Sequence, residues 1–264
     1  MNVKLISFAI LSGVCMTSFA APVDLNSPFK DYRPVAALFG GASWINGLNH
    51  SMSLAGTDDE MFTYRTNGPG SATTFGGGFI GVERALSYHT ISVQLGVEYD
   101  NVGTTTVKGS SLAGIQDDTS TLYLYSYQIA TQQIMGAAKL LGTLELPKVM
   151  PYHLHPYFSI ALGTAVNKAS SFTTNTAEVG SVNLTPTFAN GSDTQFSYNS
   201  GVGVDADITP HFRLGVGYRY SNFGKISLGR GVVSVNQYRA YVDSSLRSSN
   251  VFANQFLAQL TFIA

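Results

Sequence analysis

The segment His211–Phe223, which reads HFRLGVGYRYSNF, alternates between two kinds of side chain. Large apolar or aromatic residues stand at every second position from Phe212 to Tyr220, and the positions between them hold only glycine or arginine. A period of two is typical of a β-strand, in which successive side chains point to opposite faces. The segment therefore predicts a strand with one apolar face, which packs either on a soluble core or against lipid.

The same alternation recurs along the chain and predicts eight strands. They cover residues Val35–Ile45, Thr73–Arg84, His89–Asn101, Tyr123–Leu141, Pro156–Asn167, Gln195–Ile208, His211–Phe223 and Val251–Ala264. Short turns follow the even-numbered strands, and long polar segments follow the odd-numbered ones: Asn46–Ala72, Val102–Leu122, Lys168–Ser192 and Gly224–Asn250. This sorting of connections is typical of outer-membrane barrels. We therefore expect an all-β fold, an eight-stranded antiparallel up-and-down transmembrane β-barrel with four long extracellular loops.

The first twenty residues have the pattern of a secretory signal peptide. Lys4 supplies a positive charge, Leu5–Val14 an apolar run, and Ser18-Phe19-Ala20 a small-x-small cleavage site. The apolar run is shorter than the roughly 20 residues that a membrane-spanning helix needs. We therefore expect residues 1–20 to be a signal peptide, residues 21–34 a periplasmic N-terminal segment, and residues 35–264 the outer-membrane β-barrel domain.

The balance of charge excludes several other classes of protein. Lys and Arg number 15 against 16 Asp and Glu, which is not the basic balance of a nucleic-acid-binding protein. The single cysteine, Cys15, lies in the predicted signal peptide, so a disulfide-stapled secreted domain is not expected. Charged residues make up only 12% of the chain, which favours a barrel with apolar faces turned outward over a lipocalin-like soluble barrel. The expected location is the cell outer membrane.

The short turn Thr209-Pro210-His211 fixes a register for the strands on either side. The expected partners are Ile208 with Phe212, Asp207 with Arg213, Asp205 with Gly215, and Gly201 with Arg219. This register turns both arginines inward and predicts an ion pair between Asp207 and Arg213, with Asp205 diagonal to the same arginine. A slip by one residue would expose both arginines to lipid, at a cost of about 2 to 4 kcal/mol each near the mid-plane.

Six charged residues are expected to point into the barrel and to form an ion network: Glu83, Glu98, Asp205, Asp207, Arg213 and Arg219. Such charges could line a conduction path. However, an eight-stranded barrel is only just wide enough for its own side chains, so a filled and ion-paired interior is the expected arrangement. A narrow path for small or hydrophobic solutes, as in OmpW-like barrels, stays open as an alternative.

Leu214–Gly224 (LGVGYRYSNFG), the glycine-rich alternating strands and a C-terminal strand rich in Phe together resemble the small outer-membrane β-barrel family of OmpA-like and opacity-type surface proteins. The resemblance covers essentially the whole chain after residue 20, and its motifs are architectural. It implies insertion by the barrel-assembly machinery. One departure is that such barrels usually end in an aromatic residue, whereas Ile263 and Ala264 follow Phe262 here.

Ser221 and Asn222 invite comparison with the His-x-Ser-Asn signature of outer-membrane lipid A deacylases. That chemistry needs a histidine beside the serine to take its proton, and this chain has Arg219 and Tyr220 there instead. An unactivated serine is a poor nucleophile. A membrane hydrolase that acts on lipid A is therefore an alternative that these residues do not support.

The five histidines provide no clear site either. Four of them are expected at the periplasmic rim, facing water and headgroups: His89, His153, His155 and His211. The pair His153-x-His155 lacks the further ligands of a metal site. Asp58-Asp59-Glu60 with His50 is the one constellation similar to that of an omptin-like protease, and its loop spacing alone is weak support. We therefore expect no enzymatic activity, no cofactor and no metal.

Aromatic residues are expected to form belts at the two membrane–water interfaces. The outer belt is expected to hold Trp44, Tyr99, Tyr218, Tyr220, Phe223 and Phe252, and the periplasmic belt Phe212 and Phe262. The loops beyond the outer belt differ in charge. The first loop holds Asp58, Asp59 and Glu60, and the fourth holds the candidate interaction residues Lys225, Arg230, Arg239 and Arg247.

Two arrangements are open for the basic fourth loop. It meets lipopolysaccharide phosphates or an acidic host surface, or it packs on the acidic first loop. Val232–Val242 also alternates, which allows the seventh and eighth strands to continue above the membrane as a hairpin. The expected function is that of a structural and surface-interaction protein, adhesin-like or antigen-like, with outer-membrane lipid, lipopolysaccharide and a host or cell-surface ligand as partners. The alternative is a narrow passive conduit.

Overall fold

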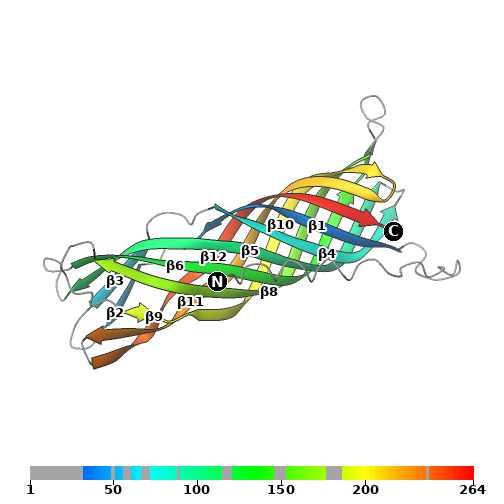
Figure 1. The fold of residues 1–264 in the computed structure, drawn as a ribbon. Helices are drawn as coiled ribbons and strands as arrows, with labels where there is room; N and C mark the ends of the chain where they lie inside the picture. The colour runs from blue at the N-terminus through cyan, green and yellow to red at the C-terminus, as the bar shows by residue number, and fades with distance from the viewer. Residues whose placement is uncertain are drawn as a thin grey trace, which may run out of the picture. The chain divides into compact units, whose positions relative to one another are not determined.

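The computed structural model describes residues 32–48, 51–55, 61–66, 72–87, 90–114, 121–145, 153–176, 186–235 and 238–264. The predicted signal peptide and most of the expected periplasmic segment lie outside these residues. Residues 33–264 form one compact unit. The strands are β1 (Tyr32–Asn46), β2 (Ser51–Ala55), β3 (Met61–Thr66), β4 (Ala72–Ser87), β5 (Ile91–Gly114), β6 (Thr121–Gly142), β7 (Leu144–Glu145), β8 (His153–Thr176), β9 (Thr187–Phe188), β10 (Gly191–Thr209), β11 (Phe212–Val235) and β12 (Tyr238–Ile263) (Figure 1). No helix in the described part of the chain is long and apolar enough to cross a membrane.

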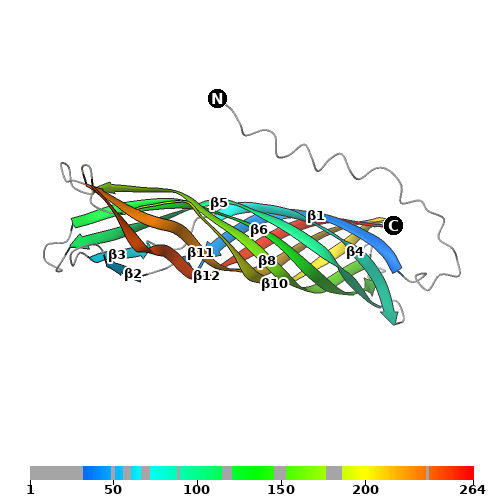
Figure 2. The ribbon, with the colours of Figure 1, turned by 90° about the horizontal axis from the view of Figure 1, so that it is seen from below.

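Eight of the strands close into a ring. Their order around it, β1, β4, β5, β6, β8, β10, β11 and β12, is their order in the chain, and the pairing of β12 with β1 completes the ring. Figure 2 shows the strands running at a tilt around the barrel. The prediction of an eight-stranded antiparallel up-and-down barrel is confirmed. A closed ring leaves no free sheet edge, which a wall in lipid requires because lipid offers the backbone no hydrogen-bond partners.

The register of β10 against β11 is the predicted one over most of its length. The pairs are Asp207 with Arg213, Asp205 with Gly215, and Gly201 with Arg219. The expected pair of Ile208 with Phe212 is wrong, because Thr209 takes that place and a β-bulge skips Ile208. Thr209 Oγ1 accepts hydrogen bonds from the backbone N–H groups of His211 and Phe212, at 3.3 and 3.0 Å, and so closes a turn of only two residues.

Each of the eight strands presents large apolar side chains outward, and we call this zone the apolar band. One exposed example from each strand, in ring order, is Leu38, Ile80, Leu95, Ile134, Ile160, Val202, Val216 and Leu260. A band of exposed apolar residues around a whole barrel would drive aggregation in water, whereas hydrocarbon solvates it. The barrel is therefore built to span a membrane.

The strands run well beyond the apolar band. β5, β8 and β11 have 24 residues each and β12 has 26, whereas a tilted strand needs only about 9–11 residues to cross a bilayer. The prediction of four long loops is therefore wrong in large part, since much of Val102–Leu122, Lys168–Ser192 and Gly224–Asn250 is barrel wall. Val235 pairs with Tyr238, so the hairpin continuation of the last two strands is confirmed.

We call this far part of the wall the extension. It comprises β2, β3 and β9 with the far ends of β5, β6, β8, β11 and β12, and Figure 1 shows it at the end opposite the C-terminal residue. β3 pairs with the end of β5, and β9 pairs with β11. The segments predicted as the first and third loops thus contribute short strands to the wall.

The two faces of the wall exchange their character between the apolar band and the extension. Arg213 and Arg219 point inward, and Phe223 on the same face of β11 is fully buried. The expected place of Phe223 in the outer belt is wrong, because it stands at an odd position like the two arginines. Beyond it, a β-bulge at Gly224, whose φ is +74°, shifts the alternation so that Ile226 is buried. The extension therefore has an apolar interior, as a soluble barrel has.

Candidate functional site

The interior of the apolar band holds an ion cluster near the turn between β10 and β11. Glu83 on β4 is fully buried and accepts hydrogen bonds from Arg213 Nη1 at 2.6 Å and Gln94 Nε2 at 2.8 Å. Arg33 on β1 pairs with the other oxygen of Glu83. Arg213 Nε donates to Asp207 Oδ1 at 2.9 Å, across the hairpin. One arginine thus joins two carboxylates, while Arg33 and Gln94 are members that sequence reasoning missed.

The contacts of Asp205 differ from the expectation. It was expected diagonal to Arg213, but its oxygens accept hydrogen bonds from Lys139 Nζ and Gln259 Nε2, both at 2.7 Å. Lys139 reaches Asp205 from β6, which lies two strands away in the ring. The Nζ atom of Lys139 also lies 3.7 Å from the centre of the Tyr157 ring. Hairpin register carries no information on such a partner from a distant strand.

His155 belongs to the same cluster. Its side chain is buried, its Nε2 lies 3.0 Å from Asp207 Oδ2, and its Nδ1 lies 3.2 Å from Thr143 Oγ1. The expectation that it faces water at the rim is wrong, because every second side chain of β8 points inward and His155 shares that parity with the buried Tyr157. The parity was readable from the sequence and could have placed this histidine.

A second ion cluster lies farther along the interior, around Arg219. Its Nη1 lies 2.6 Å from Glu98 Oε1, and its Nη2 lies 2.8 Å from Asp100 Oδ2. Its Nε donates to Gln255 Oε1 at 2.8 Å. The guanidinium carbon stands 5.2 and 5.1 Å from the ring centres of Phe39 and Phe75. Asp100 and Gln255 were not predicted, although both stand at inward positions of their strands.

Between the two clusters lies a cavity of about 50 Å³, lined by both polar and apolar side chains. Its lining includes residues of both clusters, among them Glu98, Lys139, Tyr157, Arg219 and Gln259. A water molecule needs roughly 10–15 Å³ of such volume, so the cavity has room for a few waters. A solute could pass only if the side chains of both clusters separated.

The interior of the extension is filled by aromatic side chains. Tyr64 of β3 stands edge-on to Tyr125 of β6 and Phe188 of β9, at ring-centre distances of 5.5 and 5.6 Å. Phe188 in turn stands edge-on to Phe172 of β8 at 5.0 Å. Tyr64 is fully buried, and burial raises its pKa, as it raises the pKa of Tyr125 to about 12. The side chains of the short strands β3 and β9 thus help to close the interior of the extension with an aromatic layer, in addition to the ion clusters nearer the turn.

The serine of the deacylase-like segment lacks catalytic surroundings. Ser221 is buried, and its hydroxyl donates to Gln255 Oε1 at 2.9 Å. His155 is engaged with Asp207, and His211 Nδ1 lies 3.0 Å from the carbonyl oxygen of Ile263. Among the described residues, no group of three or more His, Cys, Asp or Glu could hold a metal ion. The remaining candidates lie outside the described residues: His50, Asp58, Asp59, Glu60 and His89.

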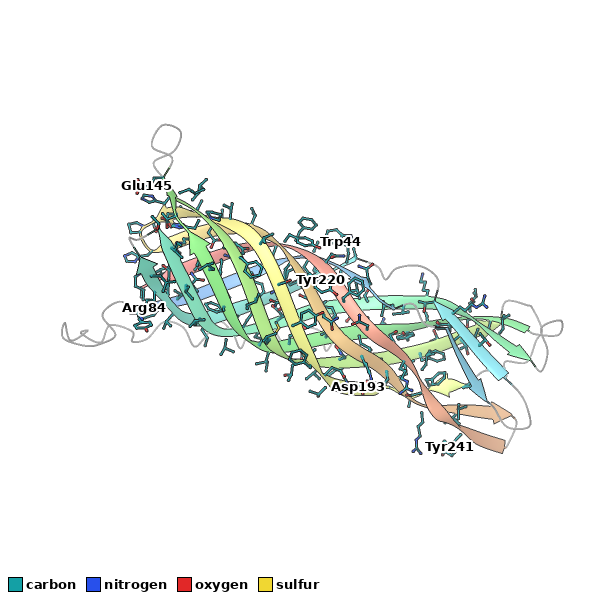
Figure 3. The ribbon with its side chains drawn as sticks, turned by 180° about the vertical axis from the view of Figure 1, so that it is seen from behind. Trp44, Arg84, Glu145, Asp193, Tyr220 and Tyr241 are labelled. Atoms are coloured by element: carbon teal, nitrogen blue, oxygen red, sulfur yellow. The ribbon has the colours of Figure 1, made fainter. Side chains whose placement is uncertain are left out.

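An aromatic belt marks the boundary between the apolar band and the extension. Trp44 stands edge-on to Phe256 at 5.7 Å, and Tyr220 packs on Phe252 at 5.5 Å. Figure 3 shows Trp44 and Tyr220 midway along the barrel, with Tyr241 of the extension well beyond them. Other expected belt residues on the outer face are Tyr99 and Tyr218, with Phe212 and Phe262 at the opposite end.

The four candidate cations of the expected fourth loop lie beyond this belt, on paired strands. Lys225 and Arg230 belong to β11, and Arg239 and Arg247 belong to β12. Lys225, Arg230 and Arg247 are exposed, whereas the side chain of Arg239 is outside the described part. In the ladder between the two strands, Ser227 stands opposite Arg247 and Ser234 opposite Arg239, and β-bulges interrupt the ladder on both sides of Arg230.

No family model matches the chain, and no curated protein matches its sequence. Among solved structures, Neisserial surface protein A is similar at 13% identity over 86% of this chain and 96% of its own, with a TM-score of 0.36. Ail, the attachment invasion locus protein of Yersinia pestis, is similar at 10% identity over 87% and 98%, with a TM-score of 0.33. The outer membrane protease OmpT from Escherichia coli is similar at 10% identity over 92% and 100%, with a TM-score of 0.41. Likeness at this level carries no argument about function.

Proposed function

We propose that this chain is a surface protein of the Gram-negative outer membrane that acts by binding through the outer wall of its extension. The observation that carries the proposal is the closed interior. Ion clusters fill the barrel interior at the level of the apolar band, and an aromatic layer fills the interior of the extension. A solute would have to separate buried charged partners and then enter a dry core, and both steps are costly. The closed interior therefore favours a binding role over the narrow conduit.

The build of the extension supports a binding role. Its strands are hydrogen-bonded into ladders up to Val235 and Tyr238 and packed on an apolar core. A surface that is already ordered loses little conformational entropy when a ligand binds, which favours affinity. The partners that we propose are outer-membrane lipid and lipopolysaccharide at the base of the extension, and a host or cell-surface ligand farther out. No catalytic step is part of the proposal.

The C-terminal residues support insertion by the barrel-assembly machinery. Ile263 N donates to the carbonyl oxygen of His211 at 2.9 Å, and Ala264 N donates to that of Pro34 at 3.0 Å. Ile263 is buried, whereas Phe262 is exposed on the outer face beside Phe212. The two extra residues therefore complete the seam, and Phe262 stays available as the aromatic signal of the last strand.

Conductance across planar bilayers tests the closed interior. The full chain after signal removal should give no channel steps. The variant Tyr64→Ala with Phe188→Ala weakens the aromatic layer and leaves the ion clusters unchanged, so it should also stay silent. Reproducible single-channel steps from the unaltered chain would contradict the proposal and favour the conduit.

Labelling of introduced cysteines on intact cells tests the orientation. Cys15 is the only native cysteine and lies in the predicted signal peptide, so each variant would carry one thiol. Tyr241→Cys on the extension should react with a membrane-impermeant maleimide. Arg84→Cys, which lies at the opposite end of the barrel in Figure 3, should react only after the cells are opened. The reverse pattern is incompatible with a surface-exposed extension.

A further inference from the structure

Among the side chains that the structure describes, the exposed charged residues of the extension are all cations. Six cations face outward among the side chains that the structure describes there: Arg65, Lys108, Lys168, Lys225, Arg230 and Arg247. None of them forms an ion pair with a described carboxylate. A described carboxylate at the base of the extension, Asp193, accepts hydrogen bonds from the backbone N–H of Ser227, at 2.9 Å, and from its hydroxyl. A wall of this kind attracts anions.

Three of these cations lie at the base of the extension, and we call Lys168, Lys225 and Arg247 the cationic row. Each is exposed and has at least one buried, inward-facing neighbour on its strand, so it points outward. The buried neighbours are Asn167 and Ala169 for Lys168, Ile226 for Lys225, and Leu246 and Ser248 for Arg247. The alternation of the strands therefore fixes the direction of all three side chains.

Strand pairing brings the three cations side by side. Lys168 on β8 stands opposite Ser192 on β10, and Ser227 on β11 stands opposite Arg247 on β12. The hydrogen bond from Ser227 N to Asp193 joins the two halves of this path. Lys225 lies on the same face of β11 as Ser227. Neighbouring strands are about 4.8 Å apart, so the row spans roughly 14 Å of the circumference. Ser192, Ser227 and the Asp193 carboxylate that accepts from Ser227 lie between its cations.

The level of the cationic row indicates its ligand. Lys225 follows the belt residue Tyr220 on β11, and Arg247 precedes Phe252 on β12, each by a short stretch of strand. At a rise of about 3.3 Å per residue along a tilted strand, the cations stand on the order of 10 Å beyond the belt, at the level of lipid headgroups. Arginine and lysine are the side chains that proteins commonly use to bind phosphate.

We propose that the cationic row binds the phosphate groups of lipid A in the outer leaflet, an inference that rests on the proposed surface orientation. The row follows the circumference of the barrel, so it lies against the lipids that surround the wall. A soluble acidic ligand would have to displace those headgroups to reach it. Arg65, Lys108 and Arg230 are not part of this row.

Calorimetric titration of the full chain in zwitterionic micelles tests the site. Lipid A should bind tightly, and dephosphorylated lipid A, phosphatidylglycerol and inorganic phosphate should bind weakly. The triple variant Lys168→Gln, Lys225→Gln and Arg247→Gln should lose affinity for lipid A by roughly 100-fold, about fivefold for each charge. The charge-matched control Arg65→Gln, Lys108→Gln and Arg84→Gln should lose less than fivefold, the loss of about one such charge.

Each other outcome overturns the inference. Equal losses in the two triple variants would show general charge attraction, and competition by inorganic phosphate alone would show a simple anion site. A triple variant that unfolds more readily without lipid, yet binds lipid A normally, would show that the cations pair within the protein. If a variant fails to fold, the comparison of lipid A with dephosphorylated lipid A on the unaltered chain still tests whether binding depends on phosphate. Binding of lipid A does not depend on whether the barrel conducts solutes, so the conductance measurement tests the closed interior separately.

Discussion

Replacing Arg219 by methionine should destabilise the barrel by about 3–5 kcal/mol, the cost of leaving buried charges without their partner. The guanidinium lies 2.6 Å from Glu98 and 2.8 Å from Asp100, and methionine leaves these two carboxylates facing each other. Glu98 keeps a hydrogen bond from Asn199 Nδ2 at 3.0 Å. Apart from the ion pair with Arg219, neither oxygen of Asp100 has a hydrogen-bond partner among the described residues. The larger share of the cost therefore falls on Asp100.

A triple variant separates the charge effect from packing. When Glu98→Gln and Asp100→Asn accompany Arg219→Met, no buried charge is left in the cluster, and most of the loss should be recovered. The part that remains is the hydrogen bond to Gln255, which contributes about 1 kcal/mol. The double variant without the arginine change leaves a lone buried cation and should again be unstable.

Equilibrium unfolding in urea, with the protein inserted into lipid vesicles, measures these differences in free energy. Trp44 is the only tryptophan and packs in the aromatic belt, so its fluorescence reports the unfolding of the apolar band. If Arg219→Met costs less than about 1 kcal/mol, as for a solvent-exposed pair, the cluster is not a buried one. A triple variant no more stable than the single variant would refute the charge argument.

Three further predictions concern the bulge, the turn and the aromatic layer. Gly224→Ala should destabilise the extension by about 1 kcal/mol or more, because φ is +74° there. The control Gly136→Ala should not, because an added Cβ there would lie 3.9 Å from its nearest atom; equal urea midpoints for the two variants would contradict the prediction. Thr209→Ala should cost about 1 kcal/mol by removing the acceptor that closes the turn, and Thr209→Ser should restore it; an unchanged alanine variant would show the acceptor to be dispensable. Burial raises the pKa of Tyr64 and raises the pKa of Tyr125 to about 12. The neutral side chains therefore stabilise the folded extension fully below the unfolded tyrosine pKa of about 10, and this stabilisation is lost as the pH rises toward 12. Near-ultraviolet circular dichroism should show the extension loosening in that window, and a spectrum unchanged at pH 12 would count against the buried layer.

The ring and the inward direction of its arginines could be predicted because alternate residues of a strand face opposite sides, and only the apolar side can face lipid. Arg213 and Arg219 alternate with large apolar residues, and the opposite parity would place both cations in hydrocarbon. The Asp207–Arg213 pair followed from the same reasoning, since a tight hairpin determines the partners of residues close to it. Phe223 shares this parity, so its burial was also within reach of the sequence.

Contacts across the barrel could not be predicted in this way. Arg213 meets Glu83, which lies 130 residues away, and Lys139 meets Asp205 from two strands away. These contacts depend on how the strands are staggered around the ring, and no single strand shows the stagger. The extent of the wall was missed for a different reason. A β-bulge such as that at Gly224 inserts one residue and shifts the alternation, so the strand beyond it no longer matches the pattern before it.

The exchange of polar and apolar faces at the aromatic belt sets the depth at which the barrel rests. If the barrel sank, Lys225 and Arg247 would approach hydrocarbon, where a cation at the mid-plane costs about 2–4 kcal/mol. If it rose, exposed apolar side chains would enter water at about 25 cal/mol for each Å². A closed ring with a packed interior also has little freedom to change its height. In a bilayer of unmatched thickness, the lipids around it must therefore thin or thicken to meet the protein.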